Sequence, residues 1–188
     1  MTDADDHADG IAPERSGSDS AGTDASEPDT SELDTFDHET HLRRAIELAR
    51  VAADRGDEPF GSVLVRDDRI VAEASNRVHT ADDVRRHPEL DLAARAVRDA
   101  TPAERARTVM YTSTEPCPMC SGGIRSAGLG RVVYAVGSDE IAEFQGEPMP
   151  PVRSRDVLAG VTEVVGPVSN AAGRAVHTEY GWDGRRDD

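Results

Sequence analysis

Two short motifs restrict most strongly what this chain can fold into. One places His87 and Glu89 on either side of a proline, and the other places Cys117 and Cys120 three positions apart. Zinc binds imidazole and thiolate ligands, and three protein ligands leave its fourth position open for a water, as in catalytic zinc sites. A fold that uses these side chains must bring the two motifs together, and the combination then predicts a zinc-dependent hydrolase.

Both motifs fall at the start of a predicted helix. Pro88 directly follows His87 and Pro116 directly precedes Cys117, and proline is accepted in the first turn of a helix. A helix N-terminus offers unpaired N–H groups and a partial positive charge, which favour thiolate over thiol. Each helix should follow a strand, so we expect the ligands to meet at the carboxyl ends of the strands, where α/β folds carry their sites.

The spacing of apolar residues predicts an α/β fold, a three-layer α/β/α sandwich with a mixed sheet of about five strands. Asp37 is a plausible N-cap for the first helix, and Gly56 should end it. Residues 138–159 should hold a short helix, a Pro-rich loop and a helical turn. The expected strands are 60–66, 70–74, 108–112, 132–136 and 161–165, with further helices from about residues 88, 117 and 171.

The charge of the chain is concentrated at its N-terminus. The formal net charge is −16, and residues 1–40 contain thirteen acids and a single base, Arg15. A segment so polar cannot bury enough surface to offset its ordering entropy. We therefore expect residues 1–36 to be a disordered acidic tail, a solvating segment rather than a binding arm, and residues 37–188 to be the catalytic domain.

Every cationic side chain is arginine, because lysine is absent from the sequence. An acidic, lysine-free chain suggests a halophilic protein, since carboxylates keep a surface hydrated at high salt while the salt screens their repulsion. A GC-rich genome that prefers arginine codons explains the missing lysines equally well.

The sequence also bears on the location of the protein. No apolar run reaches the length of a membrane span, and the acidic N-terminus lacks the apolar stretch of a secretory signal. The expectation is a cytoplasmic protein with no membrane partner. In that compartment a pair of cysteines three positions apart favours metal or redox chemistry over a disulfide.

The combination of His-x-Glu with Pro-Cys-x-x-Cys resembles the signature of the zinc-dependent cytidine deaminase superfamily. The resemblance covers roughly residues 38–136, and it includes the segments 58–65, 76–78 and 111–134. Within the superfamily these segments are most similar to the nucleobase and nucleoside branch, which contains guanine deaminase-like and tRNA-adenosine deaminase-like enzymes. The predicted three-layer sandwich is the cytidine deaminase-like fold.

The resemblance implies roles for particular residues. One Zn²⁺ per subunit would be held by the three ligands, and Glu89 would be the proton shuttle. A zinc-bound hydroxide would attack the ring carbon that carries the amino group, and ammonia would leave. Phe60 and Asn76 would bind the base, and the enzyme would be a homodimer. Taken alone, Glu89 would be read as an ordinary first-turn acid, but His87 beside it and the cysteines downstream favour the functional role. Taken alone, Phe60 could equally be a core aromatic and Asn76 a turn residue. The implied metal ligands are His87, Cys117 and Cys120.

The substrate is predicted less closely than the reaction. The Pro59-Phe60-Gly61 segment is more similar to guanine- and cytosine-type enzymes than to tRNA enzymes, so we favour a small nucleobase or nucleoside, with a guanine-type purine first. The alternatives are a tRNA-specific adenosine deaminase, which is less favoured because the chain lacks a basic surface, and a cytosine or cytidine deaminase. Pro88 stands where the family has a small residue, and a first helical turn accepts proline. Residues 83–86 also depart from the family pattern, and this second departure bears on substrate identity because the loop borders the substrate mouth in the family.

Three further readings remain open at this point. Tyr180 or Trp182 could cover the active site of a partner subunit, as in related guanine deaminases, or could pack on its own domain. A structural zinc module would need a fourth ligand, for which His79 is near enough in sequence. A thioredoxin-like redox protein would use the cysteines alone and would need neither His87 nor Glu89.

Overall fold

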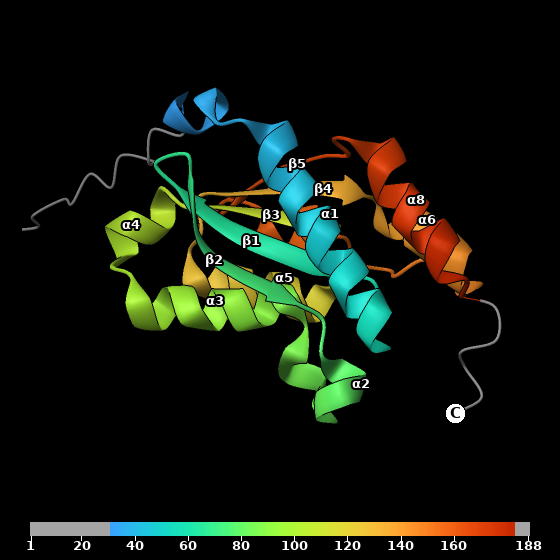
Figure 1. Cartoon of the computed structure of the whole chain (residues 1–188). Coiled ribbons are helices and arrows are strands. Elements are labelled where there is room, and N and C mark those ends of the chain that lie inside the picture. The colour runs from blue at the N-terminus through green and yellow to red at the C-terminus, as the bar shows by residue number, and fades with distance from the viewer. Residues whose placement is uncertain (1–30, 183–188) are drawn as a thin grey trace, which may run out of the picture.

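The computed structural model describes residues 31–182 and consists of one mixed five-stranded sheet between two layers of helices (Figure 1). The strand order is β2-β1-β3-β4-β5, with β1 antiparallel to both of its neighbours and the other pairs parallel. The predicted α/β/α sandwich is therefore confirmed. The strands are β1 (Gly61–Arg66), β2 (Arg69–Ser75), β3 (Val109–Thr114), β4 (Arg131–Val136) and β5 (Glu163–Val165).

Each face of the sheet has its own helices and its own core. On one face lie α1 (His38–Arg55), α6 (Ser138–Gln145) and α8 (Asn170–Tyr180). They pack against the buried side chains that β1, β3 and β4 direct to this face. On the other face lie α3 (Pro88–Asp99), α5 (Pro118–Ala127) and α7 (Ser154–Leu158). Alternation along β3 divides its residues between the two cores, with Tyr111 on the first face and Met110 on the second.

Local sequence sets the ends of the elements. The Asp37 side chain accepts a hydrogen bond from the Thr40 N–H and begins α1, which Gly56 ends in a left-handed conformation, as predicted. Helices α3 and α5 follow β2 and β3, whose carboxyl ends lie at the same edge of the sheet. The two helices also pack against each other on the second face. Both metal-ligand motifs therefore lie at one edge of the sheet.

The structure departs from the expected elements in three places. Ser31–Thr35 forms a 3₁₀ turn whose Leu33 is buried in the first core, so the last part of the expected tail packs on the domain. The remainder of the expected tail, residues 1–30, lies outside the described residues. The polar loop after β2 contains short helical turns, α2 (Val78–Ala81) and a 3₁₀ turn (Val84–Arg86).

An additional helix, α4 (Pro102–Ala106), follows α3. It is begun by a capping box in which the side chains of Thr101 and Glu104 each accept a hydrogen bond from the other's backbone N–H, a signal that the sequence contains but that hydrophobic spacing does not reveal. Within residues 31–182, no helix is both long and apolar enough to span a membrane.

Candidate active site

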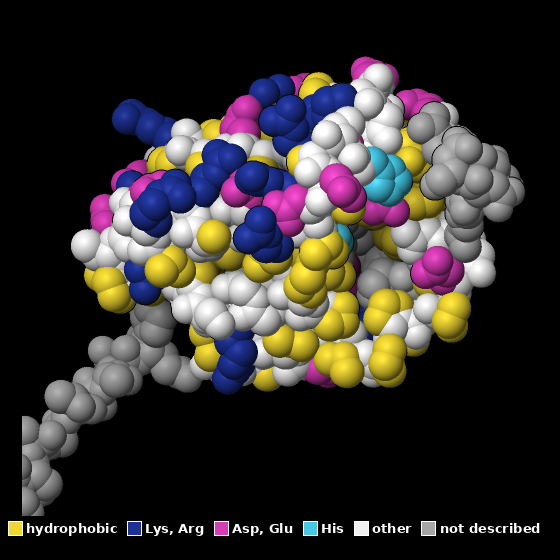
Figure 2. Space-filling view, turned by 90° about the horizontal axis from the view of Figure 1, so that it is seen from below, with side chains coloured by type: hydrophobic (Ala, Val, Ile, Leu, Met, Phe, Trp, Pro, Cys, Tyr) yellow, Lys and Arg dark blue, Asp and Glu magenta, His cyan; other side chains and the backbone are white. Residues whose placement is uncertain are grey.

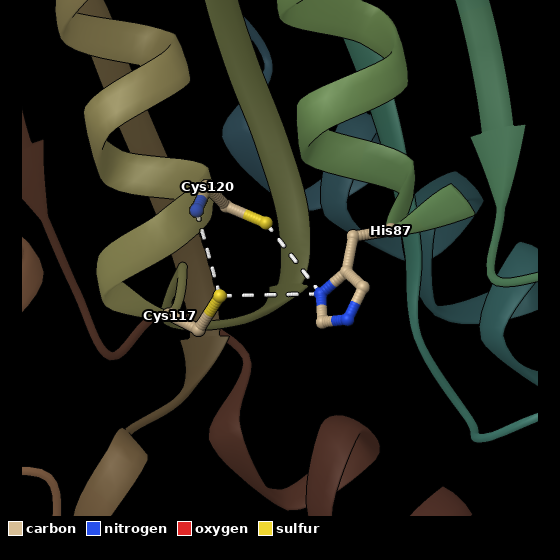
Figure 3. A group of neighbouring side chains, drawn as sticks. All are labelled: His87, Cys117 and Cys120. Carbon is tan, nitrogen blue, oxygen red and sulfur yellow. Dashed lines mark hydrogen bonds between the residues drawn. The ribbon is translucent and has the colours of Figure 1, made fainter. Parts of the chain in front are cut away.

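The three predicted metal ligands lie together at the edge of the sheet (Figure 3). The His87 Nδ1 is 3.6 Å from the Cys120 Sγ and 3.9 Å from the Cys117 Sγ. Ligand atoms around a tetrahedral zinc are roughly 3.4–3.8 Å apart, given Zn–S and Zn–N bonds of about 2.3 and 2.0 Å. The spacing and chemistry of the donor set therefore fit a zinc ion.

Helix N-termini position these ligands. His87 is the N-cap residue of α3 and Cys117 is the N-cap residue of α5, and the Cys117 Sγ accepts a hydrogen bond from the Cys120 N–H at 3.5 Å. The hydrogen bond between the two cysteine side chains, with help from His87 and this N–H, lowers the pKa of Cys117 to about 4. A thiolate is thus favoured at this position, as a metal ligand requires.

Glu89 lies beside the three ligands, in the first turn of α3, and is buried. Its Oε2 is 3.6 Å from the Cys120 Sγ, and its Oε1 accepts a hydrogen bond from the Thr112 hydroxyl at 2.6 Å. Burial raises the pKa of Glu89 above its usual range, although the Thr112 bond acts in the opposite direction. A carboxyl group with a raised pKa beside a metal site is suited to taking up and releasing a proton.

The hydroxyl that holds Glu89 is itself oriented by the sheet. Ser62 on β1 is paired with Thr112 on β3, and the Ser62 hydroxyl donates to the Thr112 Oγ1 at 2.9 Å. All three side chains are buried, so this chain of hydrogen bonds fixes the Glu89 carboxylate without solvent. Sequence reasoning missed Thr112 and Ser62, because buried polar residues on strands have no distinctive spacing.

A cavity of about 190 Å³ opens beside the ligands, and the space-filling view shows a hollow with histidine and acidic side chains at its edge (Figure 2). His87, Glu89 and Cys117 form one side, here called the metal wall. A second part of the lining, here called the outer wall, consists of α6 residues and of the segment that follows α6. The lining residues of the outer wall are Ser138, Ile141, Ala142, Gln145, Glu147, Pro148 and Pro150.

Of the two predicted base-binding residues, Phe60 lines this cavity. Asn76 does not line it but is buried directly behind, since its backbone N–H donates to the Phe60 carbonyl at 2.9 Å. The Asn76 Oδ1 accepts a hydrogen bond from the Val78 N–H, and its Nδ2 has no partner among the described residues. An unpaired buried amide donor is costly, so this atom is available to a ligand that reaches it.

The C-terminal aromatic residues pack on their own domain. The Phe60 ring lies 5.9 Å from the His177 ring and 6.1 Å from the Trp182 ring, between centroids, and Tyr180 packs edge-on against Trp182. His177 is almost fully buried, and its two ring nitrogens have no partner among residues 31–182. Burial lowers the pKa of His177 to about 4, so it is neutral at physiological pH. This cluster supports Phe60 from behind.

Glu115, two residues before Cys117, connects the metal wall to the outer wall. Its buried carboxylate accepts hydrogen bonds from the N–H and hydroxyl groups of Ser138 and of Ser154, and from the Arg153 guanidinium. Burial by itself would raise the pKa of Glu115, but these donors hold it at about 2. Ser138 begins α6 and Ser154 begins α7, so one carboxylate fixes both ends of the segment that forms the outer wall.

The group of side chains that could hold a metal within residues 31–182 consists of the three predicted ligands, and His79 is not part of it. With no fourth ligand among the described residues, the donor set resembles a catalytic rather than a structural zinc site. The juxtaposition of His87 and Glu89 with the cysteines also distinguishes the site from a dithiol redox motif.

Comparisons with known proteins agree with this geometry. The family model described as MafB19-like deaminase matches residues 36–153. A probable cytosine deaminase of Schizosaccharomyces pombe is 36% identical over 157 residues, which cover 78% of this chain and 93% of that protein. The guanine deaminase of Bacillus subtilis is 39% identical over 108 residues, which cover 57% of this chain and 69% of that protein.

Solved structures place the fold in the same class. The crystal structure of NE0047 in complex with 2,6-diaminopurine matches with a TM-score of 0.66 and 26% identity, over 78% of this chain and 82% of that one. The fold and the site define a cytidine deaminase-like protein. More particularly, the chain belongs to the MafB19-like deaminase family, and it is a hydrolytic deaminase.

Proposed function

We propose that this protein is a zinc-dependent deaminase of a free nucleobase or nucleoside, with a guanine-type purine as the favoured substrate. The observation that carries the proposal is the convergence of His87, Cys117 and Cys120 around one point, with the Glu89 carboxylate beside them at the floor of a cavity. Hydrolytic deamination needs an activated water, a group that moves protons, and an enclosed space for one ring.

The residues of the metal wall divide this work. His87, Cys117 and Cys120 would hold the zinc ion, which when bound supplies Lewis-acid activation of a water. Glu89 takes one proton from the water and gives it to the ring nitrogen as the water oxygen bonds to the ring carbon. It then moves the second proton from the added hydroxyl to the amine, so that the C–N bond breaks, a carbonyl forms and ammonia leaves. Thr112 keeps the Glu89 carboxylate turned towards the ligands through its 2.6 Å hydrogen bond.

The remaining contacts bind the substrate. Phe60 lines the cavity, and the Asn76 Nδ2 directly behind it would donate a hydrogen bond to a ring acceptor that reaches it. A volume of about 190 Å³ is below the roughly 300–1,000 Å³ of pockets for drug-sized ligands. It suits a single base better than a base with its sugar fully enclosed.

Cytosine is the second candidate substrate. The similarity to a probable cytosine deaminase extends over more of the chain than the similarity to a guanine deaminase, with 157 against 108 aligned residues. A tRNA-specific adenosine deaminase of Agrobacterium fabrum is 33% identical over 96 residues, half of this chain. We rank tRNA third because the chain is strongly acidic, with a formal net charge of −16.

Three properties of the whole protein complete the proposal. We infer a homodimer from the family resemblance, and a cytoplasmic location from two free cysteines at a site that needs them reduced. We also infer adaptation to high salt from the acidic, lysine-free composition, and expect the melting temperature to rise in molar KCl. Light scattering that gives a monomer, or a melting temperature indifferent to KCl, would remove the corresponding inference.

The test of the function is ammonia release by zinc-loaded protein, in low and in molar KCl. The panel is guanine, guanosine, cytosine, cytidine, adenine, adenosine and tRNA, with the Glu89→Ala variant as the control. We expect turnover of a free base or nucleoside that disappears in the variant. Activity on tRNA alone would show that the protein is an RNA-modifying enzyme. Turnover that survives in the variant would show that Glu89 is not needed for the reaction.

A further inference from the structure

Four glutamates line the cavity beside the metal site, and their surroundings differ. Glu89 is held by Thr112, and Glu115 accepts hydrogen bonds from three residues. Glu58, in contrast, is a half-buried residue whose carboxylate makes no hydrogen bond or ion pair with any described residue. The fourth glutamate, Glu147, lies in the outer wall.

The neighbouring residue shows that this isolation is particular to Glu58. The Asp57 carboxylate is fully buried and accepts hydrogen bonds from Arg55 and from both the N–H and the hydroxyl of Thr80. Adjacent carboxylates thus point in different directions: one anchors the α2 loop, and the other faces the cavity beside Phe60. Burial raises the pKa of Glu58, as expected for a carboxylate without a donor.

We propose that Glu58 is a specificity-determining residue that accepts a hydrogen bond from an N–H group of the base. A carboxylate is an acceptor only, and a partly desolvated one without a partner is stabilised by any ligand that brings it a donor. The imidazoles of His79 and His87 lower the pKa of Glu58 through their charge, but no described side chain makes a hydrogen bond or ion pair with its carboxylate. A substrate that presents an N–H group would therefore supply the donor that this carboxylate lacks.

This requirement selects a chemical class of substrate, and it rests on the proposed function. The amino group that leaves is directed at the metal wall, so the base needs another N–H for Glu58. Free cytosine and free adenine carry an N–H on the ring nitrogen that bears the sugar in nucleosides. Free guanine carries that N–H and a second N–H elsewhere on its ring. Cytidine, adenosine and the adenosine of tRNA have none beyond the amino group. Glu58 therefore favours free cytosine and free adenine over their nucleosides, whereas guanine keeps an N–H for it in either form.

The test is binding of matched ligands to the zinc-loaded protein, measured by calorimetry in the Glu89→Ala background so that no turnover occurs. The ligand pairs are cytosine with 1-methylcytosine and adenine with 9-methyladenine, because methylation removes the N–H and keeps the amino group. We expect Glu58→Leu to weaken the parent bases by about 10- to 100-fold, the range for a hydrogen bond to a charged group. The methylated bases should lose no affinity.

A control and a second variant keep the test specific. Asp54→Asn removes an exposed carboxylate near the end of α1 and should change neither ligand. Glu58→Gln, which keeps an acceptor oxygen but no charge, should have an intermediate effect. With Glu89 intact, the same substitutions should raise KM much more than they lower kcat.

The outcomes separate this inference from the proposed function. Equal losses for parent and methylated bases, no loss for either, or no binding by any base would overturn the role of Glu58. Binding of parent bases that depends on Glu58, without ammonia release by the intact enzyme, would overturn the proposed function and retain the inference.

Discussion

The two walls of the cavity are built in different ways. The metal wall comes from two helix N-termini, and each of its side chains lies within a short motif at the start of a helix. The outer wall comes from α6 and the segment that follows it, and its position depends on hydrogen bonds to Glu115 from residues up to 39 positions away. The difference suggests that the metal wall determines the reaction and the outer wall contributes to the choice of substrate.

Removing one of the three proposed metal ligands should have the largest effect. Cys120→Ala leaves two protein ligands, too few for a stable catalytic zinc site. We expect zinc content to fall well below one ion per chain and ammonia release to fall to background, while the fold is retained because both cores are elsewhere. Metal analysis and an activity assay check this prediction, and full activity with full zinc content would contradict it.

Glu89→Gln should abolish catalysis and leave the metal in place. The amide has nearly the same shape as the carboxylate but cannot carry the proton, so kcat should fall by about 10²- to 10⁴-fold. Zinc content should remain at one ion per chain, which separates this variant from the loss of a ligand. A variant that kept more than about half of the kcat would show that the metal wall does not need this carboxylate.

Glu115→Gln breaks the connection between the two walls. Its folded pKa of about 2 lies below the ordinary value of 4.5, so its stabilisation is present above pH 4.5 and is lost as the pH falls through about 2. We expect the free energy of unfolding at pH 7 to fall by about 3 kcal/mol, with the difference from the parent protein disappearing near pH 2.

The same variant should raise KM more than it lowers kcat, because the outer wall loosens while the metal wall keeps its ligands. Denaturant unfolding at several pH values and steady-state kinetics measure the two effects. Glu179→Gln, at an exposed ion pair with Arg50, is the matched control and should cost less than about 0.5 kcal/mol. A loss of unfolding free energy that does not depend on pH would show that the Glu115 side chain stabilises the fold through its packing and not through its charge.

Thr112→Val should have a moderate effect on the metal wall alone. The substitution keeps the shape of the side chain but removes the hydroxyl that donates to Glu89 and accepts from Ser62. We expect kcat to fall by about 10-fold, in line with a lost hydrogen bond to a charged group, and the pKa of Glu89 to rise further. The acidic limb of the pH–rate profile should therefore move to higher pH, and an unchanged profile would argue against the contact.

His177→Phe should have the smallest effect, and it tests the support behind Phe60. The neutral ring of His177 is favoured in the folded state, so its contribution to stability is present above pH 6.5 and is lost as the pH falls through about 4. The variant removes two unpartnered nitrogens and should be more stable by about 1 kcal/mol at pH 7. It should also lose stability less steeply between pH 6.5 and 4.

The elements with clear local signals were predicted closely. Asp37 and Gly56 delimit α1 as expected, and Pro88 begins α3. Apart from α4, whose local capping box hydrophobic spacing does not reveal, the errors fall where the signal is tertiary. Leu33 is an isolated apolar residue in an acidic segment, yet it reaches the first core, and short helical turns formed in the polar loop after β2. Single apolar residues carry no periodicity, so burial of this kind is not visible in a sequence.

The sequence by itself determined the metal wall, because its chemistry depends on residue types at short spacings: His87 and Glu89 around one proline, and two cysteines one helical turn apart. Only the tertiary structure decided which other side chains meet them. Thr112 orients Glu89 across the sheet, Glu115 holds a distant segment in place, and Glu58 lines the cavity without a hydrogen-bond partner among residues 31–182. Such contacts depend on strand register and on packing between segments far apart in the chain, which no local spacing encodes.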